Sequence, residues 1–324
     1  MSEDYVICVR NIVGVGQDQR FGTEPGPTRF LRVPSGEAPQ PAHQIAKREW
    51  IDAVLQRAST GTNPLTGIPT GDVLVFIHGY NNSPEISLQR HRRLEADLRE
   101  AGYQGAVVSF DWPSAQSVLN YLEDRDDAKA TARRLRDDGI SLFSTRQAKG
   151  CEINVHVLGH STGAYVIREA FSQADEKRSI KETPWTVSQV ALIGGDISSR
   201  SLSLLDARGK SLYRHCIRLT NYQNPYDWVL KLSNTKRFGV APRVGRVGLP
   251  DDASSKAVNV DCGPYFRTLD EEQAEYYGTF AHSWHIGNKV FAKDLCYTLQ
   301  GNIDRARIPT RRRENGRLIL MEER

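Results

Sequence analysis

The sequence predicts an α/β protein with a mostly parallel, doubly wound sheet and helices on both faces. Two observations carry this prediction. Short apolar, β-branched runs alternate along the chain with longer charged segments that have helical periodicity. The apolar runs are continuous, which is typical of strands buried on both faces of a parallel sheet. Regular alternation of such strands and helices favours a doubly wound sheet.

The elements follow in order along the chain. Strands are expected at residues 73–77, 106–110, 153–158, 187–193, 216–219 and 257–260. Helices are expected at residues 43–58, 85–101, 121–142, 164–174 and 288–299. Residues 14–42 are rich in Gly and Pro and lack periodicity, so a long loop or a wrapping extension is expected there. The N-terminal stretch is β-rich and could add antiparallel edge strands.

The segment Gly159-His160-Ser161-Thr162-Gly163 joins the strand at 153–158 to the helix at 164–174. A G-x-S-x-G sequence at a strand-to-helix turn is typical of a nucleophile elbow in the α/β-hydrolase fold. The glycines permit a tight turn that presents Ser161 Oγ at the carboxyl edge of the sheet. The alternative is a Gly-rich connection with an incidental serine. The flanking strand and helix favour the nucleophile.

A nucleophilic serine needs a histidine base, and the base needs an acid that orients it. In this fold the order along the chain is Ser, Asp or Glu, His. Three histidines follow Ser161, and His215 begins a strand, which places it at the wrong edge. His282 and His285 both lie in the loop before the last helix. Their position does not separate them as candidate bases.

Two aspartates follow strands at the edge where the acid is expected, Asp196 and Asp227. Chain order favours Asp227, which comes one strand later than Asp196. Asp196 could instead stabilise a turn or cap a helix. Asp227 could likewise cap the segment 228–232.

The developing oxyanion needs two backbone N–H donors. Thr162, which follows the nucleophile, is expected to supply one of them. The loop after the strand at 73–77 is expected to supply the other, with Tyr80 N–H as the candidate. His78 in the same loop is expected to be structural and hydrogen-bonded to the loop.

The segments VLVFIHGYNNS, VVSFDWPS and VHVLGHSTGAYV resemble a bacterial family of α/β-hydrolase-fold proteins with an HGYN oxyanion signature, long catalogued as a domain of unknown function. The segments YDWVL and AHSW are similar to its acid and base segments. The resemblance spans about residues 70–300. It implies a serine hydrolase with Asp227 as acid, His282 as base and Asp196 outside the catalytic group. His285 stands where the resemblance leads us to expect an aromatic residue, so His282 and His285 both stay candidates for the base.

The expected organisation is an N-terminal extension over residues 1–60, an α/β-hydrolase domain over 61–302 and an Arg-rich tail over 303–324. We expect the tail to be solvated and partly mobile. No run of about 18 apolar residues and no secretory signal pattern is evident. The five cysteines are widely spaced and odd in number. They suggest free thiols in a reducing compartment, so a cytoplasmic protein is expected.

The favoured function is cleavage of an ester-like bond, a carboxylic ester or thioester, in a small-molecule or lipid substrate. No P-loop and no H-E-x-x-H motif occurs, and we expect no cofactor and no metal. A net charge of +4 without aromatic interleaving predicts no nucleic-acid partner. The alternatives are a catalytically silent binding protein of this fold and a lipase or phospholipase whose basic tail meets a membrane. Oligomeric state is not readable from the sequence.

Overall fold

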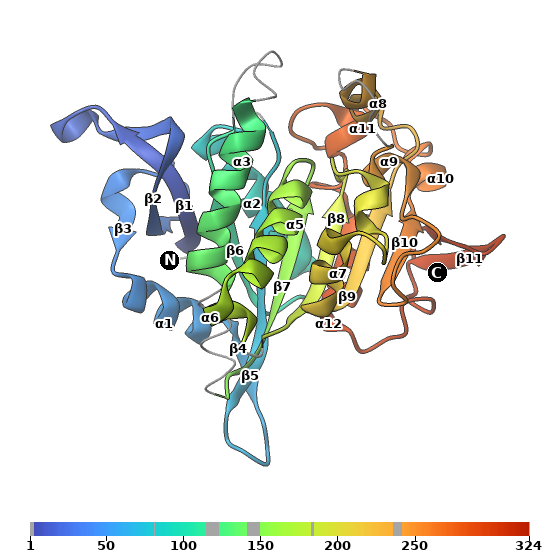
Figure 1. The fold of residues 1–324 in the computed structure, drawn as a ribbon, viewed down its shortest axis with the longest axis horizontal. Helices are drawn as coiled ribbons and strands as arrows, with labels where there is room; N and C mark the ends of the chain where they lie inside the picture. The colour runs from blue at the N-terminus through green and yellow to red at the C-terminus, as the bar shows by residue number, and fades with distance from the viewer. Residues whose placement is uncertain are drawn as a thin grey trace.

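One mixed sheet connects the strands of the protein in the computed structural model (Figure 1). The structure describes residues 3–80, 82–114, 123–140, 150–182, 185–235 and 242–323. The strands are β1 (Glu3–Val13), β2 (Arg20–Pro34), β3 (Gln44–Ile45), β4 (Ser59–Thr62), β5 (Pro69–Ile77), β6 (Ala106–Asp111), β7 (Glu152–His160), β8 (Val187–Ile193), β9 (Cys216–Gln223), β10 (Ala257–Asp261), β11 (Arg311–Glu314) and β12 (Arg317–Leu320). Their order in the sheet is β11-β12-β10-β9-β8-β7-β5-β6-β1-β2-β3, and β4 pairs with β5 outside this path.

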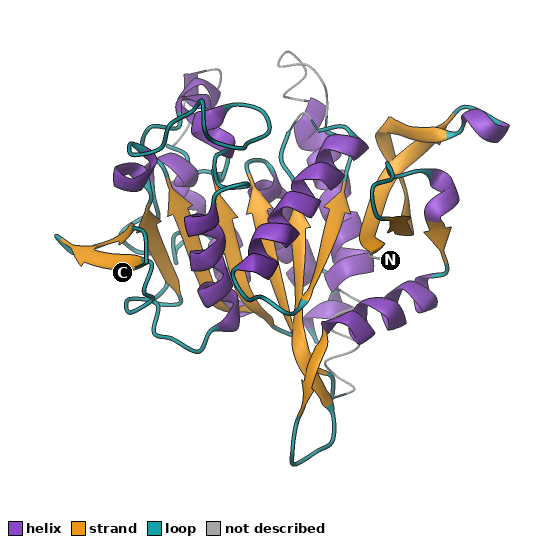
Figure 2. Cartoon of the chain, turned by 180° about the vertical axis from the view of Figure 1, so that it is seen from behind, coloured by secondary structure: helices purple, strands orange, loops and turns teal. Residues whose placement is uncertain are grey.

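Helices cover both faces of the sheet. They are α1 (Lys47–Ala58), α2 (Pro84–Glu100), α3 (Glu123–Arg134), α5 (Gly163–Glu176), α6 (Arg178–Lys181), α7 (Ala207–Arg214), α8 (Trp228–Thr235), α9 (Val244–Val247), α10 (Gly263–Phe266), α11 (Phe280–Ser283) and α12 (Lys289–Gln300). A π-helix follows α3 at Leu135–Ile140, and 3-10 turns occur at Gly16–Asp18, Pro41–His43 and Ser199–Leu202. Helices α3, α5 and α7 lie on the near face in Figure 1. Figure 2 shows other helices on the far face.

Each face has its own hydrophobic core, and β5 contributes to both. Val73, Val75 and Ile77 belong to the core that also holds residues of α1, α3, α5 and α7. Leu74 and Phe76 belong to the core that holds residues of α2 and α12. Successive side chains of a strand point to opposite faces, so one continuous apolar run contributes to both cores. The predicted α/β-hydrolase fold class is confirmed, and the six predicted strands are present. The helix predicted from residue 43 begins only at Lys47, because residues 44–45 form the short strand β3. The helix predicted over 121–142 is α3 and the π-helix that follows it, and residues 121–122 and 141–142 lie outside the described residues.

The chain changes direction in the sheet at β5, and this change places the functional loops together. From β5 the chain moves outward to β6, returns to pair β7 with the other edge of β5, and continues to β8, β9 and β10. These neighbouring pairs are all parallel. In Figure 2 the arrowheads of the central strands point to one edge. The loops after β5 and β7 therefore meet at a topological switch point, where open α/β sheets bind ligands.

The N-terminal region, predicted as an extension over residues 1–60, is part of the sheet, and β2 and β3 are the antiparallel edge strands that its β-rich sequence indicated. Strand β1 lies inside the sheet and is parallel to β6, with Tyr5 opposite Val108. The segment 14–42, expected to be a loop, contains the 15-residue strand β2, antiparallel to β1. Its Gly and Pro residues accompany register shifts, and a Cβ at Gly26 would lie 2.5 Å from the Arg10 carbonyl oxygen. Gly and Pro are usually signs of a turn, but in β2 they occur at bulges and where two backbones approach closely.

The Arg-rich segment also differs from the mobile tail predicted over residues 303–324. Strands β11 and β12 form a hairpin, and β12 is parallel to β10. The Arg311 side chain is fully buried and lies 2.6 Å from the Asp294 carboxylate of α12. This ion pair anchors the segment, and no local pattern distinguishes Arg311 from its exposed neighbours. The two ends of the chain lie at opposite ends of the sheet (Figure 1).

No helix in the described ranges has the length and hydrophobicity needed to cross a membrane.

Candidate active site

Ser161 occupies the turn between β7 and α5 in a strained backbone conformation. Its φ is 55°, and Asn315 is the only other non-glycine residue with positive φ in the described part of the chain. A left-handed conformation costs an L-residue about 1–2 kcal/mol, so it persists only where its surroundings hold it. Ser161 N–H donates to Ile193 O at 3.0 Å, and Ser161 O accepts from Asp196 N–H at 3.0 Å. These bonds tie the turn to the end of β8.

The two glycines of the elbow allow close packing rather than positive φ. A Cβ at Gly163 would lie 2.2 Å from the Ile77 carbonyl oxygen at the end of β5. A Cβ at Gly159 would lie 2.9 Å from the backbone nitrogen of Ala164. Helix α5 therefore begins in contact with β5 and turns back on its own strand. This close approach explains why a glycine stands on each side of Ser161.

The loop after β5 lies directly against Ser161. A Cβ at Gly79 would lie 2.6 Å from the Cβ of Ser161. The Asn82 side-chain amide donates to the carbonyl oxygens of Gly79 and Tyr80, at 2.9 and 3.0 Å. These bonds turn the two carbonyl groups toward Asn82. Asn81, the last residue of the predicted HGYN signature, lies outside the described residues.

A buried charge cluster that the sequence analysis missed supports this loop. Asp111 at the end of β6 accepts from Arg10 Nε at 2.9 Å and lies 3.1 Å from His78 Nε2. Arg10 also donates to the carbonyl oxygen of Asn82 at 2.8 Å. Burial alone raises the pKa of Asp111, but Arg10 and His78 lower it to about 2. His78 is hydrogen-bonded to Gly79 O, so its predicted structural place in the loop is confirmed. The position of Asp111 at a strand end is the signal that could have revealed it.

Thr162 begins the helix that follows the nucleophile. It is the residue before Gly163 at the start of α5, and it is buried. The backbone hydrogen bonds around the elbow leave the Thr162 N–H without an acceptor among the described residues. A free N–H at a helix N-terminus favours negative charge beside it.

Asp227 and His282 form a short buried contact from two distant segments. Asp227 Oδ2 lies 2.6 Å from His282 Nδ1, and the carboxylate is fully buried before α8. Asp227 Oδ1 accepts from Leu230 N–H at 3.1 Å. The predicted capping contact and the contact with His282 therefore occur in the same carboxylate. Burial lowers the pKa of His282, but the charge and hydrogen bond of Asp227, with the charge of Asp196, raise it above its usual value overall.

Gly194 brings His282 to the same corner as Ser161. Gly194 has a φ of 51°, and a Cβ there would lie 3.1 Å from two atoms of the His282 ring, so glycine is favoured both by the backbone and by the close approach of the ring. Gly194 follows Ile193, the residue whose carbonyl accepts the Ser161 N–H. Ser161 and His282 therefore both lie against the end of β8.

The alternative base and acid have other surroundings. His285 is buried against Trp284 and Phe291, with ring centroids 4.1 and 5.2 Å away. Burial, with the nearby His282, lowers the pKa of His285 to about 3. Asp196 forms an ion pair with Arg243 at 2.9 Å. These contacts favour His282 over His285 and Asp227 over Asp196.

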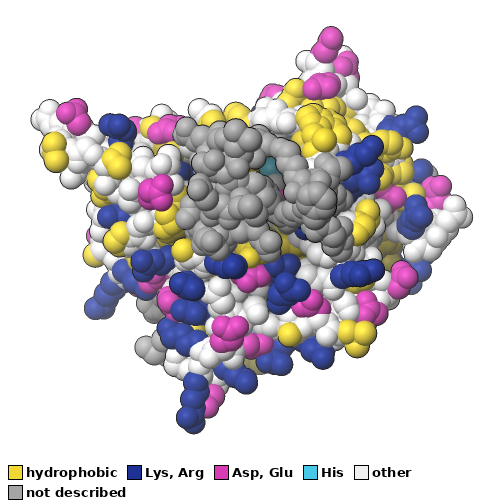
Figure 3. Space-filling view, turned by 45° about the horizontal axis from the view of Figure 1, so that its top comes forward, with side chains coloured by type: hydrophobic (Ala, Val, Ile, Leu, Met, Phe, Trp, Pro, Cys, Tyr) yellow, Lys and Arg dark blue, Asp and Glu magenta, His cyan; other side chains and the backbone are white. Residues whose placement is uncertain are grey.

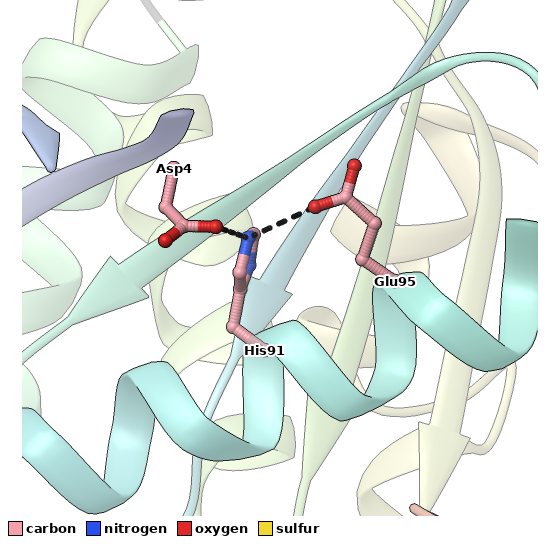
Figure 4. Close-up of side chains that lie close together, drawn as sticks. All are labelled: Asp4, His91 and Glu95. Atoms are coloured by element: carbon pink, nitrogen blue, oxygen red, sulfur yellow. Dashed lines mark ion pairs between the residues drawn. The ribbon is translucent and has the colours of Figure 1, made fainter. Parts of the chain in front are cut away.

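A second buried group combines metal-ligand side chains, Asp4 of β1 with His91 and Glu95 of α2 (Figure 4). His91 Nε2 lies 3.8 Å from Asp4 Oδ1 and 3.6 Å from Glu95 Oε2. Asp4 also pairs with Arg92, and Glu95 pairs with two arginines. These three arginines are Arg57, Arg92 and Arg99. Three guanidinium groups outweigh two carboxylates, which disfavours a divalent cation, so we assign the group to the packing of β1 on α2.

Comparison with known proteins identifies the family of this chain. Residues 58–263 match a family described as "Alpha/beta hydrolase of unknown function (DUF900)". The chain belongs to this family. The DUF900 match spans the strands β5 to β10, with the elbow, the loop after β5 and Asp227, and it ends before His282. The protein is therefore an α/β hydrolase by fold and family.

One curated relative of this DUF900 chain is an uncharacterized protein of Nostoc sp. strain PCC 7120. It is 24% identical over 161 residues, which are 42% of this chain. The chain spans only 41% of the length of that relative.

Solved structures with weak similarity include several hydrolases. A cutinase-like protein from Cryptococcus sp. has a TM-score of 0.38 at 13% identity, with 75% of this chain and 97% of that chain covered. A dienelactone hydrolase from Anabaena variabilis has a TM-score of 0.35 at 15% identity, with coverages of 81% and 86%. A thioesterase from Streptomyces coelicolor has a TM-score of 0.33 at 15% identity, with coverages of 68% and 88%.

Proposed function

We propose that this DUF900 protein is a serine hydrolase that cleaves an ester-like bond, a carboxylic ester or a thioester, through an acyl-enzyme. One observation carries the proposal. Ser161 has a strained backbone, packs against Gly79 and is hydrogen-bonded to the end of β8, where Gly194 lies against the ring of His282, whose Nδ1 is 2.6 Å from Asp227. The ends of four strands, β5, β7, β8 and β9, and a distant loop converge here, as a nucleophile with its base and acid requires.

In the first half of the proposed reaction, His282 removes the proton of Ser161 Oγ as the serine attacks the substrate carbonyl carbon. Asp227 accepts the Nδ1–H of His282 and stabilises the imidazolium that forms. The N–H groups of Tyr80 and Thr162 donate to the oxyanion of the tetrahedral intermediate. When the intermediate collapses, His282 protonates the leaving alkoxide or thiolate, and the acyl group remains on Ser161.

In the second half, His282 removes a proton from water, which attacks the acyl carbon. The second tetrahedral intermediate collapses to a carboxylic acid, and Ser161 recovers its proton from His282. The raised pKa of His282 supports this role, because Asp227 stabilises the imidazolium that forms in each half of the reaction and then returns its proton.

Steady-state hydrolysis of p-nitrophenyl and acyl-thioester substrates by the wild type and Ser161→Ala tests this function. We expect ester or thioester turnover in the wild type. Removal of the nucleophile is expected to lower kcat by about 10⁶-fold, to the detection limit, with the urea unfolding curve unchanged. Turnover in Ser161→Ala equal to that of the wild type would refute the proposal.

A further inference from the structure

Arg90 is a buried cation without a buried anion. It lies on α2, is 6% exposed, and forms no ion pair with a carboxylate among the described residues. One terminal nitrogen lies 3.4 Å from His160 Nδ1, and the other donates to the Tyr277 carbonyl oxygen. Burying a guanidinium without an anion is unfavourable by several kcal/mol. Such a position calls for a role beyond packing.

His160 connects the nucleophile to the segment that carries the base. It precedes Ser161, is 2% exposed, and its Nε2 lies 3.1 Å from the His282 carbonyl oxygen. A guanidinium can only donate, so His160 Nδ1 must accept. The proton of a neutral His160 then lies on Nε2, where it is donated to the His282 carbonyl. The contacts on both sides of the ring require the same tautomer.

We propose that Arg90 and His160 are positioning residues for the proposed acyl transfer: Arg90 holds His160 in its Nε2–H tautomer, and that N–H fixes the backbone of His282 relative to Ser161. The inference rests on the proposed function and extends it to two side chains that touch neither substrate nor reacting atoms. Arg90 also binds Tyr277, five residues before His282. The base segment is therefore held at two carbonyl groups by one network.

The network also surrounds the base with a defined set of charges. The groups that face His282 are Asp227, Asp196, Arg90, His160 and His285. Burial, with the charges of His282 and Arg90, lowers the pKa of His160 well below its usual value. A neutral His160 neither competes for the proton nor repels the imidazolium that forms on His282.

The activity test compares His160→Leu, which removes both contacts, with His160→Gln, whose amide can donate to the His282 carbonyl. A misplaced base is expected to lower kcat about 10- to 100-fold with KM within about threefold in His160→Leu. His160→Gln is expected to recover most of that loss. Arg90→Met is expected to lower kcat in the same way and to move the acid limb of kcat/KM to higher pH, because a cation that lowers the pKa of His282 is removed. The kcat of Arg90→Lys is expected to lie between those of Arg90→Met and the wild type.

His156→Leu is the matched control. His156 is a buried histidine of the same strand, and its Nε2 lies 2.9 Å from Asp72, away from the carboxyl edge. This variant is expected to lose stability and to keep the kcat of its folded fraction. If His160→Leu loses no more kcat per folded molecule than His156→Leu, the positioning role is wrong. Turnover in Ser161→Ala equal to that of the wild type would instead overturn the proposed function.

A second measurement is made on the wild type and needs no turnover, so it tests the inference even if a variant folds poorly. Long-range ¹H–¹⁵N spectra of histidine-labelled wild type report the tautomer of each ring, with His160→Gln assigning the signal. We expect His160 to be neutral with its proton on Nε2 from pH 6 to 8, and Arg90→Met to mix the two tautomers. A proton on Nδ1, or an imidazolium at pH 7, would overturn the inference.

Discussion

At the scale of single residues, the candidate site depends on what surrounds each ionisable group. His282 and His285 are three residues apart and both buried, yet their pKa values shift in opposite directions. Burial lowers the pKa of each ring, but His282 has the Asp227 carboxylate at 2.6 Å and His285 has aromatic rings. The carboxylate therefore stabilises the protonated form of His282, whereas His285 stays neutral.

The raised pKa of His282 predicts the pH dependence of the proposed reaction. The acid limb of kcat/KM is expected to have its midpoint above the usual histidine pKa of about 6.5, because the base must be neutral to act. Asp227→Asn removes the charge that raises this pKa, so the acid limb is expected to move to lower pH and kcat to fall about 10⁴-fold. A pH series of initial rates checks both. An acid limb that stays in place in Asp227→Asn would contradict the pairing.

The sequence predicted part of this site and could not predict the rest. Ser161 was found because the elbow is a local pattern of glycines, strand and helix. The choice between His282 and His285 depends on which ring reaches Asp227, 55 residues earlier. Arg10, Asp111 and Arg90 were missed for the same reason, since their partners are distant in the chain and each looks alone like an ordinary charged residue.

At the scale of elements, α8 and the turn before it place apolar side chains beside Asp227. Trp228 and Leu232, one helical turn apart, are each 51% exposed, and Tyr226 is 46% exposed. Figure 3 turns the carboxyl edge of the sheet toward the viewer and shows a group of hydrophobic side chains on this face. Exposed apolar side chains next to a site are suited to an apolar part of a substrate.

Truncation of this face is expected to change acyl-chain preference. Trp228→Ala and Leu232→Ala are expected to lower kcat/KM for decanoyl esters about 3- to 30-fold each, and to leave acetyl esters within about twofold, because only the long chain loses apolar contact. Leu65→Ala is the matched control, since Leu65 is 93% exposed in the β4–β5 hairpin. A p-nitrophenyl ester series measures this. Equal losses for acetyl and decanoyl esters would contradict a role for α8 in chain preference.

At the scale of the whole molecule, both ends of the chain extend the hydrolase sheet. Strand β1 supplies Arg10 to the loop after β5, so the N-terminal region contributes to the support of the site. At the other end, Arg311 joins β11 to Asp294 of α12 and to Tyr222 of β9. Local sequence could not predict these additions, because bulged Gly-rich strands and an Arg-rich hairpin both look like loops.

The C-terminal ion pair predicts a large effect on stability. Arg311→Met leaves the fully buried Asp294 without its cation, and the free energy of unfolding is expected to fall by about 3–5 kcal/mol. Arg313→Met is the matched control on the exposed part of the same strand and is expected to change it by less than about 0.5 kcal/mol. Urea unfolding followed by circular dichroism compares the two. Equal, small effects would indicate a tail that is not part of the core structure.

The central claim is that Ser161 is a nucleophile activated by His282. Its most direct test is labelling with a fluorophosphonate probe, read by intact mass and peptide mapping, on the wild type, His282→Ala and His285→Ala. We predict one adduct on Ser161 in the wild type, a labelling rate close to wild type in folded His285→Ala, and loss of labelling in folded His282→Ala. No adduct on the folded wild type, or labelling that survives in His282→Ala and disappears in His285→Ala, would contradict the account.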